Sequence, residues 1–367
     1  MAEGSHTRRR DIDWLRIFAA YLLLPFHVAK VFDVRPFYHL KNETLLPALD
    51  YATWFIHIWH MPLFFLLAGW SAQRSLAARG GGAFAVERLQ RILLPLLVGI
   101  VLLCPGIAHV EYNMIRGEAL ALEQSLALFF TDFAHFTWSH LWFLAYLLTF
   151  TLLTVPWMAR LPAGHDPASG EPPRRVHPLL VWAPLGTLVA AQLLLRPRWP
   201  GYQNLYDDWA NVTYYGTFFV TGFLLSRYPA FERAAHRQTP LAVVIAVLAT
   251  VIHVTGALNG GAPEVTRVAF AFASLGWVLT MLGLAHAGLR HRERGRPYLA
   301  ESAYPVYWLH QWFIVIPGYF LTRALDWPVL PEALLLLAVA AAGTVATYHW
   351  LVRPYPVPRL MLGLRPR

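Results

Sequence analysis

The chain has 367 residues, of which 57% are hydrophobic and only 14% are charged, and its formal net charge is +9. A soluble domain carries about a quarter charged residues, so this composition excludes an ordinary soluble protein and indicates that lipid surrounds much of the chain. The excess of basic residues would fit a nucleic-acid-binding protein, but their distribution along the chain argues against that function.

Ten segments are apolar enough to cross a membrane as helices, which takes about 20 residues each. The first follows an N-terminus without a signal-peptide cleavage site, so we expect it to be a retained span. In chain order the predicted spans are Trp14–Phe32, Leu49–Ala72, Ile92–Ile107, Leu141–Met158, Pro178–Leu195, Val212–Ser226, Leu241–Leu258, Val265–Leu289, Ala303–Leu325 and Glu332–Val352. Glu118–Phe133 is amphipathic and too polar to span, so we predict that it lies at the membrane surface.

The basic residues fall mainly on one side of these spans. With the N-terminus inside, 22 of the 30 lysines and arginines lie in inner segments, which is the positive-inside pattern. The sequence therefore predicts an all-α, polytopic transmembrane helical bundle in the plasma (inner) membrane, with both termini cytoplasmic. We expect cytoplasmic tails over residues 1–13 and 354–367, and a transmembrane domain over residues 14–353.

The first span contains Arg16 and, eleven residues later, His27. Eleven residues turn a helix by roughly 1100°, so both side chains share one face and lie about 16 Å apart along the axis. Polar groups at membrane depth are costly, which makes them candidates for function. A neutral imidazole at His27 would suit a general base. The alternative is a histidine that only bonds a neighbouring helix.

Further histidines lie in other spans. His57 and His60 in the second span could face one cavity; their spacing would also suit a metal ion, but no carboxylate or cysteine is close in sequence, so no metal is expected. His140 begins the fourth span and is predicted to lie at the outer interface. His310 lies near the middle of the ninth span, where it could line a cavity.

Two extramembrane segments carry other groups. Arg88 and Arg91 share a helix face at the inner surface, and two guanidinium groups there suit a phosphorylated ligand; the alternative is that they only orient the chain. On the outer side, RPRWPGYQNLYDDWANVTYY places aromatic residues beside Asp207 and Asp208. Such a segment could bind sugars or anchor the chain at the interface, and we favour the anchor.

Five sequence blocks occur in order along the chain: DIDWLRIFAAYLLLPFH, HMPLFFLLAGW, ERLQRILLP, SHLWFLAYLL and SAYPVYWLHQ. Together they resemble the acyltransferase 3 family of integral membrane acyltransferases. LPFH, HLWFL and YYGTFFVTGFLL look most like the branch that succinylates periplasmic glucans. The resemblance implies that the family's essential histidine and arginine correspond to His27 and Arg16, and its Arg-x-x-Arg pair to Arg88 and Arg91. It also suggests the membrane unit alone, without the periplasmic esterase-like domain of some members.

The resemblance implies an O-acyltransferase that moves an acyl group, acetyl or succinyl, from cytoplasmic acyl-coenzyme A (acyl-CoA) to an extracytoplasmic carbohydrate. The acceptor would be a glucan, a lipid-linked glycan or a cell-surface polysaccharide, and membrane lipids are the other expected partners. Arg88, Arg91 and Arg16 would hold the phosphates of the donor substrate.

Within this reaction, His27 would take the proton of the acceptor hydroxyl, or would itself be acylated transiently. Tyr307 and His310, about one turn apart in the ninth span, would orient His27 or donate to the thioester oxygen.

Two other functions fit part of the pattern. A proton-coupled transporter would also have many spans and buried histidines, although no internal repeat is apparent and intramembrane carboxylates are scarce. A pH-sensing or assembly protein would use His27 without any donor. Both alternatives predict that His27→Ala leaves the consumption of acyl-CoA unchanged.

Overall fold

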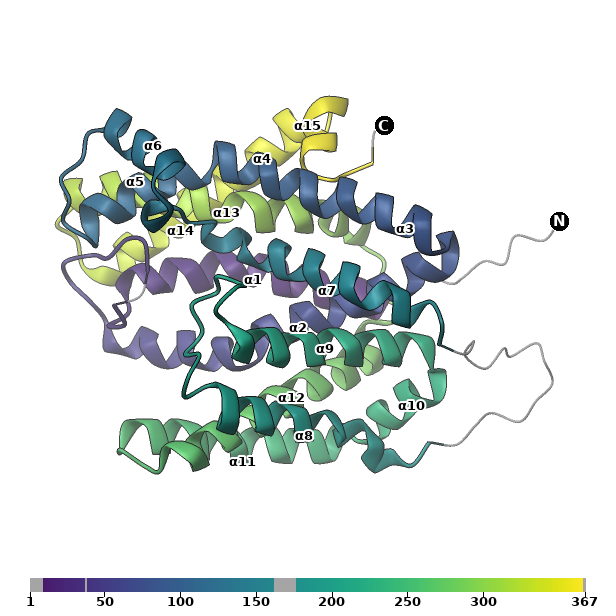
Figure 1. The fold of residues 1–367 in the computed structure, drawn as a ribbon. Coiled ribbons are helices and arrows are strands. Elements are labelled where there is room, and N and C mark those ends of the chain that lie inside the picture. The colour runs from purple at the N-terminus through teal and green to yellow at the C-terminus, as the bar shows by residue number, and fades with distance from the viewer. Residues whose placement is uncertain (1–8, 37, 162–175, 366–367) are drawn as a thin grey trace.

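The computed structural model describes residues 9–36, 38–161 and 176–365, and every regular element in these ranges is a helix (Figure 1). Residues 1–8 and 366–367, which belong to the two predicted tails, lie outside the described residues. In chain order the helices are α1 (Arg10–Phe32), α2 (Pro47–Arg79), α3 (Gly81–Arg88), η1 (Leu89–Leu93), α4 (Leu94–Leu102), α5 (Cys104–Met114), α6 (Leu122–Thr131), η2 (Phe133–His135), η3 (Ser139–Leu141), α7 (Trp142–Met158), η5 (Pro178–Trp182), α8 (Pro184–Ala190), η6 (Ala191–Leu195), α9 (Trp209–Arg227), α10 (Pro229–Arg237), α11 (Thr239–Leu258), α12 (Pro263–Leu289), α13 (Arg296–Ala324), α14 (Val329–Ala346), η7 (Thr347–Val352) and α15 (Pro356–Met361).

Each of the ten predicted spans coincides with helical structure. Among the described residues, six helices are long and apolar enough to cross a membrane, and a bent pair, Gly81–Leu102 with Cys104–Met114, would make seven. The helices α9 and α13 are long but are not among these six, and both carry polar side chains in the interior of the bundle. A multi-pass membrane protein is therefore supported, and the count of ten spans stays a prediction.

The first helix begins at Arg10, four residues before the predicted start at Trp14. The acidic residues Asp11 and Asp13 in this extra turn are buried, and each has an arginine partner, Arg9 for Asp11 and Arg296 for Asp13. These ion pairs offset the cost of burying the carboxylates. The apolar length of the segment does not reveal such pairs, so it placed the start of the helix too late.

The described parts of the segments predicted to be cytoplasmic gather at one end of the bundle. The start of α1, α10 and α15 lie at the same end in Figure 1. The indole of Trp14 donates to the carbonyl of Arg292 at 3.0 Å, and Arg10 forms an ion pair with Glu293 at 2.6 Å. This common end fits the predicted topology, while its cytoplasmic location remains a prediction.

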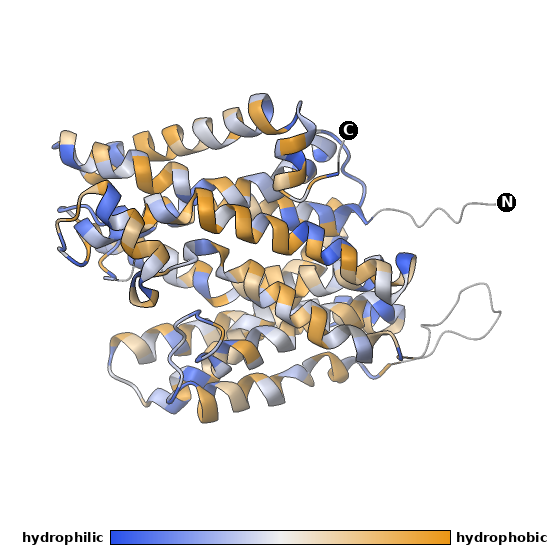
Figure 2. Ribbon diagram, turned by 45° about the horizontal axis from the view of Figure 1, so that its top comes forward, coloured by the Kyte–Doolittle hydropathy of each residue, from blue (hydrophilic) through white to orange (hydrophobic). Residues whose placement is uncertain are grey.

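The outward surface of the helices is apolar over much of their length. Figure 2 shows hydrophobic colouring along the helices and hydrophilic colouring concentrated near their ends. Leu153 on α7 and Leu194 on η6 are each 73% exposed, which would be unfavourable in water and is expected in lipid.

Close contacts between helices form the core that supports the site. Helix α1 packs against α2, α12 and α13, and α2 packs along α9. A Cβ at Gly69 would collide with the carbonyl of Phe219, and one at Gly222 would collide with the carbonyl of Leu66. These two glycines let the backbones of α2 and α9 touch, as small residues do in membrane helices.

Candidate active site

A cavity of about 480 Å³ lies between α1, α2, α5, η3 and α13, toward the end of the bundle opposite the termini. We call it the outer cavity. Its aromatic lining includes Phe26, Phe64, Trp138, Trp142, Phe143 and Tyr202. Its polar lining includes His27, Lys30, Tyr38, His39, His57, His60, Glu111, Ser139, His140, Gln203, Tyr307, His310 and Gln311. Aromatic faces with hydroxyl, amide and imidazole groups are suited to a polar ligand with apolar faces, such as a sugar.

A second cavity, of about 290 Å³, lies nearer the end that carries the termini, and we call it the inner cavity. All three arginines that the sequence singled out line it: Arg16, Arg88 and Arg91. Gly363 and Leu364, from the C-terminal segment after α15, complete its wall. No sequence signal had connected this segment with the site.

The two cavities share three lining residues, Phe64, Phe143 and Tyr307. The rings of Phe143 and Tyr307 lie edge to face with their centroids 5.6 Å apart, and the Tyr307 hydroxyl donates to the carbonyl of His140 at 2.9 Å. These side chains therefore form a layer between the arginine-lined and histidine-lined spaces. A ligand that extends from one cavity to the other has to pass this layer.

The inner cavity has more positive than negative charge in its wall. One carboxylate, Glu87, contacts Arg88 at 2.9 Å, Arg91 at 3.4 Å and Arg79 at 3.6 Å. Because Arg16, Arg88 and Arg91 line the cavity and its lining includes no carboxylate among the described residues, the wall has a net positive charge that suits phosphate. The π-helical turn η1 begins directly after Arg88 and contains Arg91, yet both side chains line the same cavity.

Arg16 faces the same space from α1. Its guanidinium lies 3.4 Å from an Asp13 oxygen and donates to the Ser71 hydroxyl at 3.0 Å. Since Arg16 lines the inner cavity and His27 the outer one, the two residues are placed along one face of α1, as their spacing of eleven predicts.

Three histidines of the outer cavity are fixed by main-chain carbonyl groups. His60 Nε2 lies 2.8 Å from the carbonyl of Ala19, His140 Nε2 lies 3.0 Å from that of Trp308, and His310 Nδ1 lies 2.6 Å from that of Tyr307. A carbonyl oxygen only accepts, so each of these nitrogens carries the proton and donates. Their tautomers are therefore set by the fold.

His27 differs from these three histidines. Its Nδ1 is buried without a hydrogen-bond partner, and its Nε2 forms no hydrogen bond within the part of the chain that the structure describes. The His27 ring stacks on Tyr38 at 5.6 Å and lies 5.0 Å from the ring of His310, whose Nε2 is likewise buried and unpartnered. Because His27 forms no hydrogen bond with the described residues and lies beside the unpartnered Nε2 of His310, its ring is available to take a proton from a ligand.

His140, predicted to lie at the outer interface, has a buried side chain. It is 7% exposed and lines the outer cavity, with its ring 5.1 Å from that of His310, and its depth in the membrane stays a prediction. His140 belongs to the short helix η3, whose three residues are all buried. The block SHLWFL contained this residue, but nothing in its spacing indicated that the imidazole lines a cavity.

The aromatic segment before α9, which is predicted to lie on the outer side, is held in place by hydrogen bonds to its two aspartates. Asp208 is fully buried and accepts hydrogen bonds from Tyr146 at 2.6 Å and Asn211 at 2.8 Å. Asp207 accepts from the indole of Trp199 at 2.8 Å. Asp208 thus holds the segment before α9 in place, whereas Tyr202 and Gln203 of this segment reach the outer cavity.

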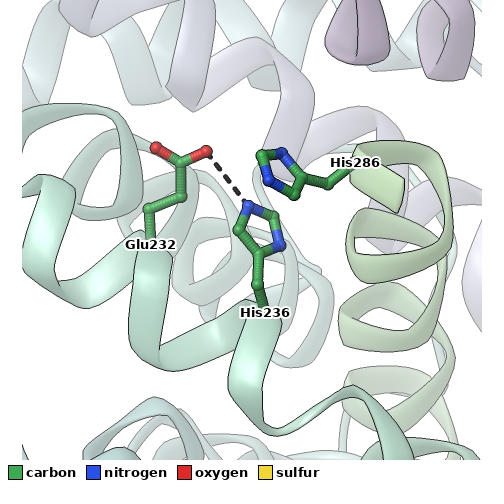
Figure 3. A group of neighbouring side chains, drawn as sticks. All are labelled: Glu232, His236 and His286. Atoms are coloured by element: carbon green, nitrogen blue, oxygen red, sulfur yellow. Dashed lines mark hydrogen bonds and ion pairs between the residues drawn. The ribbon is translucent and has the colours of Figure 1, made fainter. Parts of the chain in front are cut away.

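Another group of histidines, His236 on α10 and His286 on α12, lies beside Glu232 (Figure 3). Glu232 lies 3.2 Å from His236, whose ring stacks on that of His286 at 4.0 Å; Arg9 pairs with Glu232, and Asp11 lies 3.3 Å from His286. Potential ligand atoms of Glu232, His236 and His286 all lie within 4.8 Å of one another. Stacked rings point their lone pairs in roughly parallel directions, so a shared metal ion would require one ring to turn. We interpret this group as a link between α1, α10 and α12, and the absence of a resident metal stays a prediction.

Comparison with known proteins gives the family. Residues 9–349 match the acyltransferase domain of the acyltransferase 3 family. The chain is 22% identical over 331 residues to glucans biosynthesis protein C of Salmonella gallinarum. The aligned region covers 86% of this chain and 84% of that protein. No solved structure matches the chain. Because the family model spans nearly the whole chain, including the whole lining of the outer cavity and that of the inner cavity apart from Gly363 and Leu364, the protein belongs to the acyltransferase 3 family and is a membrane acyltransferase.

Proposed function

We propose that this enzyme transfers an acyl group from acyl-CoA, bound in the inner cavity on the cytoplasmic side of the inner membrane, to a hydroxyl group of a carbohydrate in the outer cavity. The observation that carries the proposal is the pair of adjoining cavities, one lined by arginines and the other by histidines and aromatic residues. The layer of Phe64, Phe143 and Tyr307 between them is where the thioester would meet the acceptor.

The donor phosphates would be held by Arg88, Arg91 and Arg16. These guanidinium groups line the inner cavity, and they share few carboxylates. The thioester is the far end of the donor, and the pantetheine arm would carry it past Tyr307 toward His27. Holding the donor by its phosphates leaves the reacting carbonyl free to approach the acceptor.

The acceptor hydroxyl would give its proton to His27. As that proton leaves, the hydroxyl oxygen attacks the thioester carbonyl carbon, the carbon–sulfur bond breaks, and the thiol of coenzyme A forms when the proton passes to sulfur. His310 would orient the His27 ring through its unpartnered Nε2. The Tyr307 hydroxyl already donates to the carbonyl of His140 in η3. Its role in this proposal is therefore to position η3, and it does not donate to the thioester.

The proposed acceptor is a glucan or a related cell-envelope polysaccharide, and the proposed acyl group is acetyl or succinyl. The name of the relative, glucans biosynthesis protein C, and the aromatic and amide lining of the outer cavity support a carbohydrate. A carbohydrate offers hydroxyl groups to His27 and apolar ring faces to side chains such as Trp138 and Tyr202.

Mass spectrometry of envelope glycans and lipids from cells that express the wild-type protein or His27→Ala tests this function. We expect an added acyl mass on a glycan with the wild-type protein only, at equal protein levels. The same mass in both strains would contradict the role of His27. Its absence in both, together with no binding of acetyl-CoA or succinyl-CoA by the purified protein, would contradict acyl transfer itself.

A further inference from the structure

A chain of hydrogen bonds connects Ser139, His39 and Glu111 in the wall of the outer cavity. Ser139 Oγ lies 3.0 Å from His39 Nε2, and His39 Nδ1 lies 2.5 Å from Glu111 Oε2. The three residues come from separate parts of the fold: the start of η3, the segment between α1 and α2, and helix α5. All three side chains line the cavity that also holds His27.

The chemistry of the three groups fixes the direction of these hydrogen bonds. A carboxylate accepts, so His39 Nδ1 carries the ring proton and donates it to Glu111. Arg116 lies 3.6 Å from Glu111, so the carboxylate also has a positive partner. His39 Nε2 then presents its lone pair to the Ser139 hydroxyl, which donates. The order hydroxyl, imidazole, carboxylate is the arrangement that activates serine as a nucleophile.

The backbone at Ser139 also distinguishes this serine. Its φ is +46°, in the left-handed region that residues with side chains rarely adopt. Its N–H donates to the Thr137 hydroxyl at 2.9 Å, which holds the turn. Such strained residues cluster at functional sites, and a sharp turn is a known way to present a nucleophilic serine.

Two other interactions between a serine and a histidine can be compared with the Ser139–His39 hydrogen bond. His140 Nδ1 is a second acceptor near Ser139 Oγ, but it is more distant, at 3.5 Å. A serine–histidine pair outside the cavity, Ser125 with His109, has a similar distance of 2.8 Å. Among the described residues, no carboxylate forms a hydrogen bond with His109. The carboxylate and the cavity position therefore single out Ser139.

We propose that Ser139 carries the acyl group between donor and acceptor as a seryl ester, with His39 as its base and Glu111 as the residue that positions His39. This proposal rests on the proposed function and divides the transfer into two steps. It adds a nucleophile on the enzyme where the direct reaction has none.

In the first step, Ser139 gives its proton to His39 Nε2 and its oxygen attacks the thioester carbonyl carbon. The carbon–sulfur bond breaks, and the sulfur of coenzyme A takes the proton from His39. In the second step, the acceptor hydroxyl gives its proton to His27 and attacks the seryl ester. The bond to Ser139 Oγ breaks, and this oxygen regains a proton that passes from His27 through water in the cavity.

The reactivity of Ser139 can be tested without any acyl-CoA. Full-length protein in detergent is treated with a fluorophosphonate probe, which modifies activated serines, and peptides are mapped by mass spectrometry. We expect labelling at Ser139 that disappears in Ser139→Ala and His39→Ala but is unchanged in Ser125→Ala. Glu111→Gln should slow labelling at least about tenfold, and Glu111→Asp should restore much of the rate. Labelling of Ser139 that is absent, or equal in His39→Ala, would overturn the proposal.

The covalent step is tested with radiolabelled acetyl-CoA and succinyl-CoA in the His27→Ala background, where the second step is blocked. We expect the label to accumulate on the peptide that contains Ser139 after acid quenching, and to be lost in His27→Ala/Ser139→Ala but not in His27→Ala/Ser125→Ala. Ser139→Cys should instead hold the label as a thioester that hydroxylamine removes. Probe-reactive Ser139 without acyl label would overturn the carrier role and leave direct transfer. A wild-type protein that consumes neither donor would contradict the proposed function, and the probe result distinguishes that failure from an unreactive Ser139.

Discussion

At the scale of single residues, the outer cavity contains three histidines that main-chain carbonyl groups hold in place, and it also contains His27, which is not held in this way. His60, His140 and His310 each donate to a main-chain carbonyl, whereas His27 has no hydrogen bond to the described residues. A general base needs an available lone pair directed at its substrate. Among these four histidines, His27 therefore fits that task best.

We predict that His27→Ala lowers the rate of acyl-CoA consumption by about 10²-fold to 10⁴-fold, the range for loss of a general base. His60→Gln is the matched control, because glutamine keeps an N–H group for the Ala19 carbonyl; we expect it to lower the rate less than about tenfold. Release of free thiol by purified protein measures both. Equal losses would show that His27 acts only in packing.

The arginines of the inner cavity give a different kinetic signature. Arg91→Ala removes one guanidinium group from the cavity wall, so we expect the KM for acyl-CoA to rise about tenfold with little change in kcat. Arg79 shares the same carboxylate, Glu87, but does not line the cavity, so Arg79→Ala should change KM less than about threefold. Steady-state kinetics with varied donor distinguishes the two. An unchanged KM in Arg91→Ala would mean that this arginine only orients the chain.

Sequence patterns located these side chains but not their partners. The spacing of Arg16 and His27 placed both on one face of α1, and Arg88 and Arg91 line a common cavity as their spacing indicated. Ser139, His39 and Glu111 were missed because they lie far apart in the chain and meet only through folding. The burial of His140 was missed for the same reason, since it depends on tertiary contacts of η3.

At the scale of helices, apolar length predicted where helices occur better than where they begin or bend. Every predicted span is helical, but α1 starts early because arginines neutralise Asp11 and Asp13. The third predicted span is divided into η1, α4 and α5. A bend of 46° separates the helical segment that ends at Leu102 from α5. Ion pairs and bends of this kind depend on neighbouring helices, so the hydropathy of the segment does not predict them.

The contact between α2 and α9 depends on two glycines and can be tested by adding one methyl group. In Gly69→Ala the new Cβ would collide with the carbonyl of Phe219, so the helices must separate; we expect a loss of about 1–3 kcal/mol and a lower Tm. A Cβ at Gly186 on α8 would meet nothing within 4 Å, so Gly186→Ala should leave Tm nearly unchanged. Thermal unfolding in detergent checks both. Equal Tm values for the two variants would contradict the tight crossing.

At the scale of the whole molecule, the bundle places two chemically different cavities in sequence between its ends. The arginine-lined cavity lies toward the end that carries both termini, and the histidine-lined cavity lies toward the other end. The positive-inside pattern predicts which end faces the cytoplasm. Taken together, these features support a reaction in which donor and acceptor stay on opposite sides of the membrane.

The most direct test of this account uses sealed proteoliposomes with the protein oriented so that the arginine-lined cavity faces outward. Radiolabelled acetyl-CoA or succinyl-CoA is added outside, and a glucan oligosaccharide is enclosed. We predict that the label appears on the enclosed oligosaccharide with wild-type protein and not with His27→Ala. Label that appears on the oligosaccharide only when donor and acceptor share one compartment would contradict transfer across the membrane.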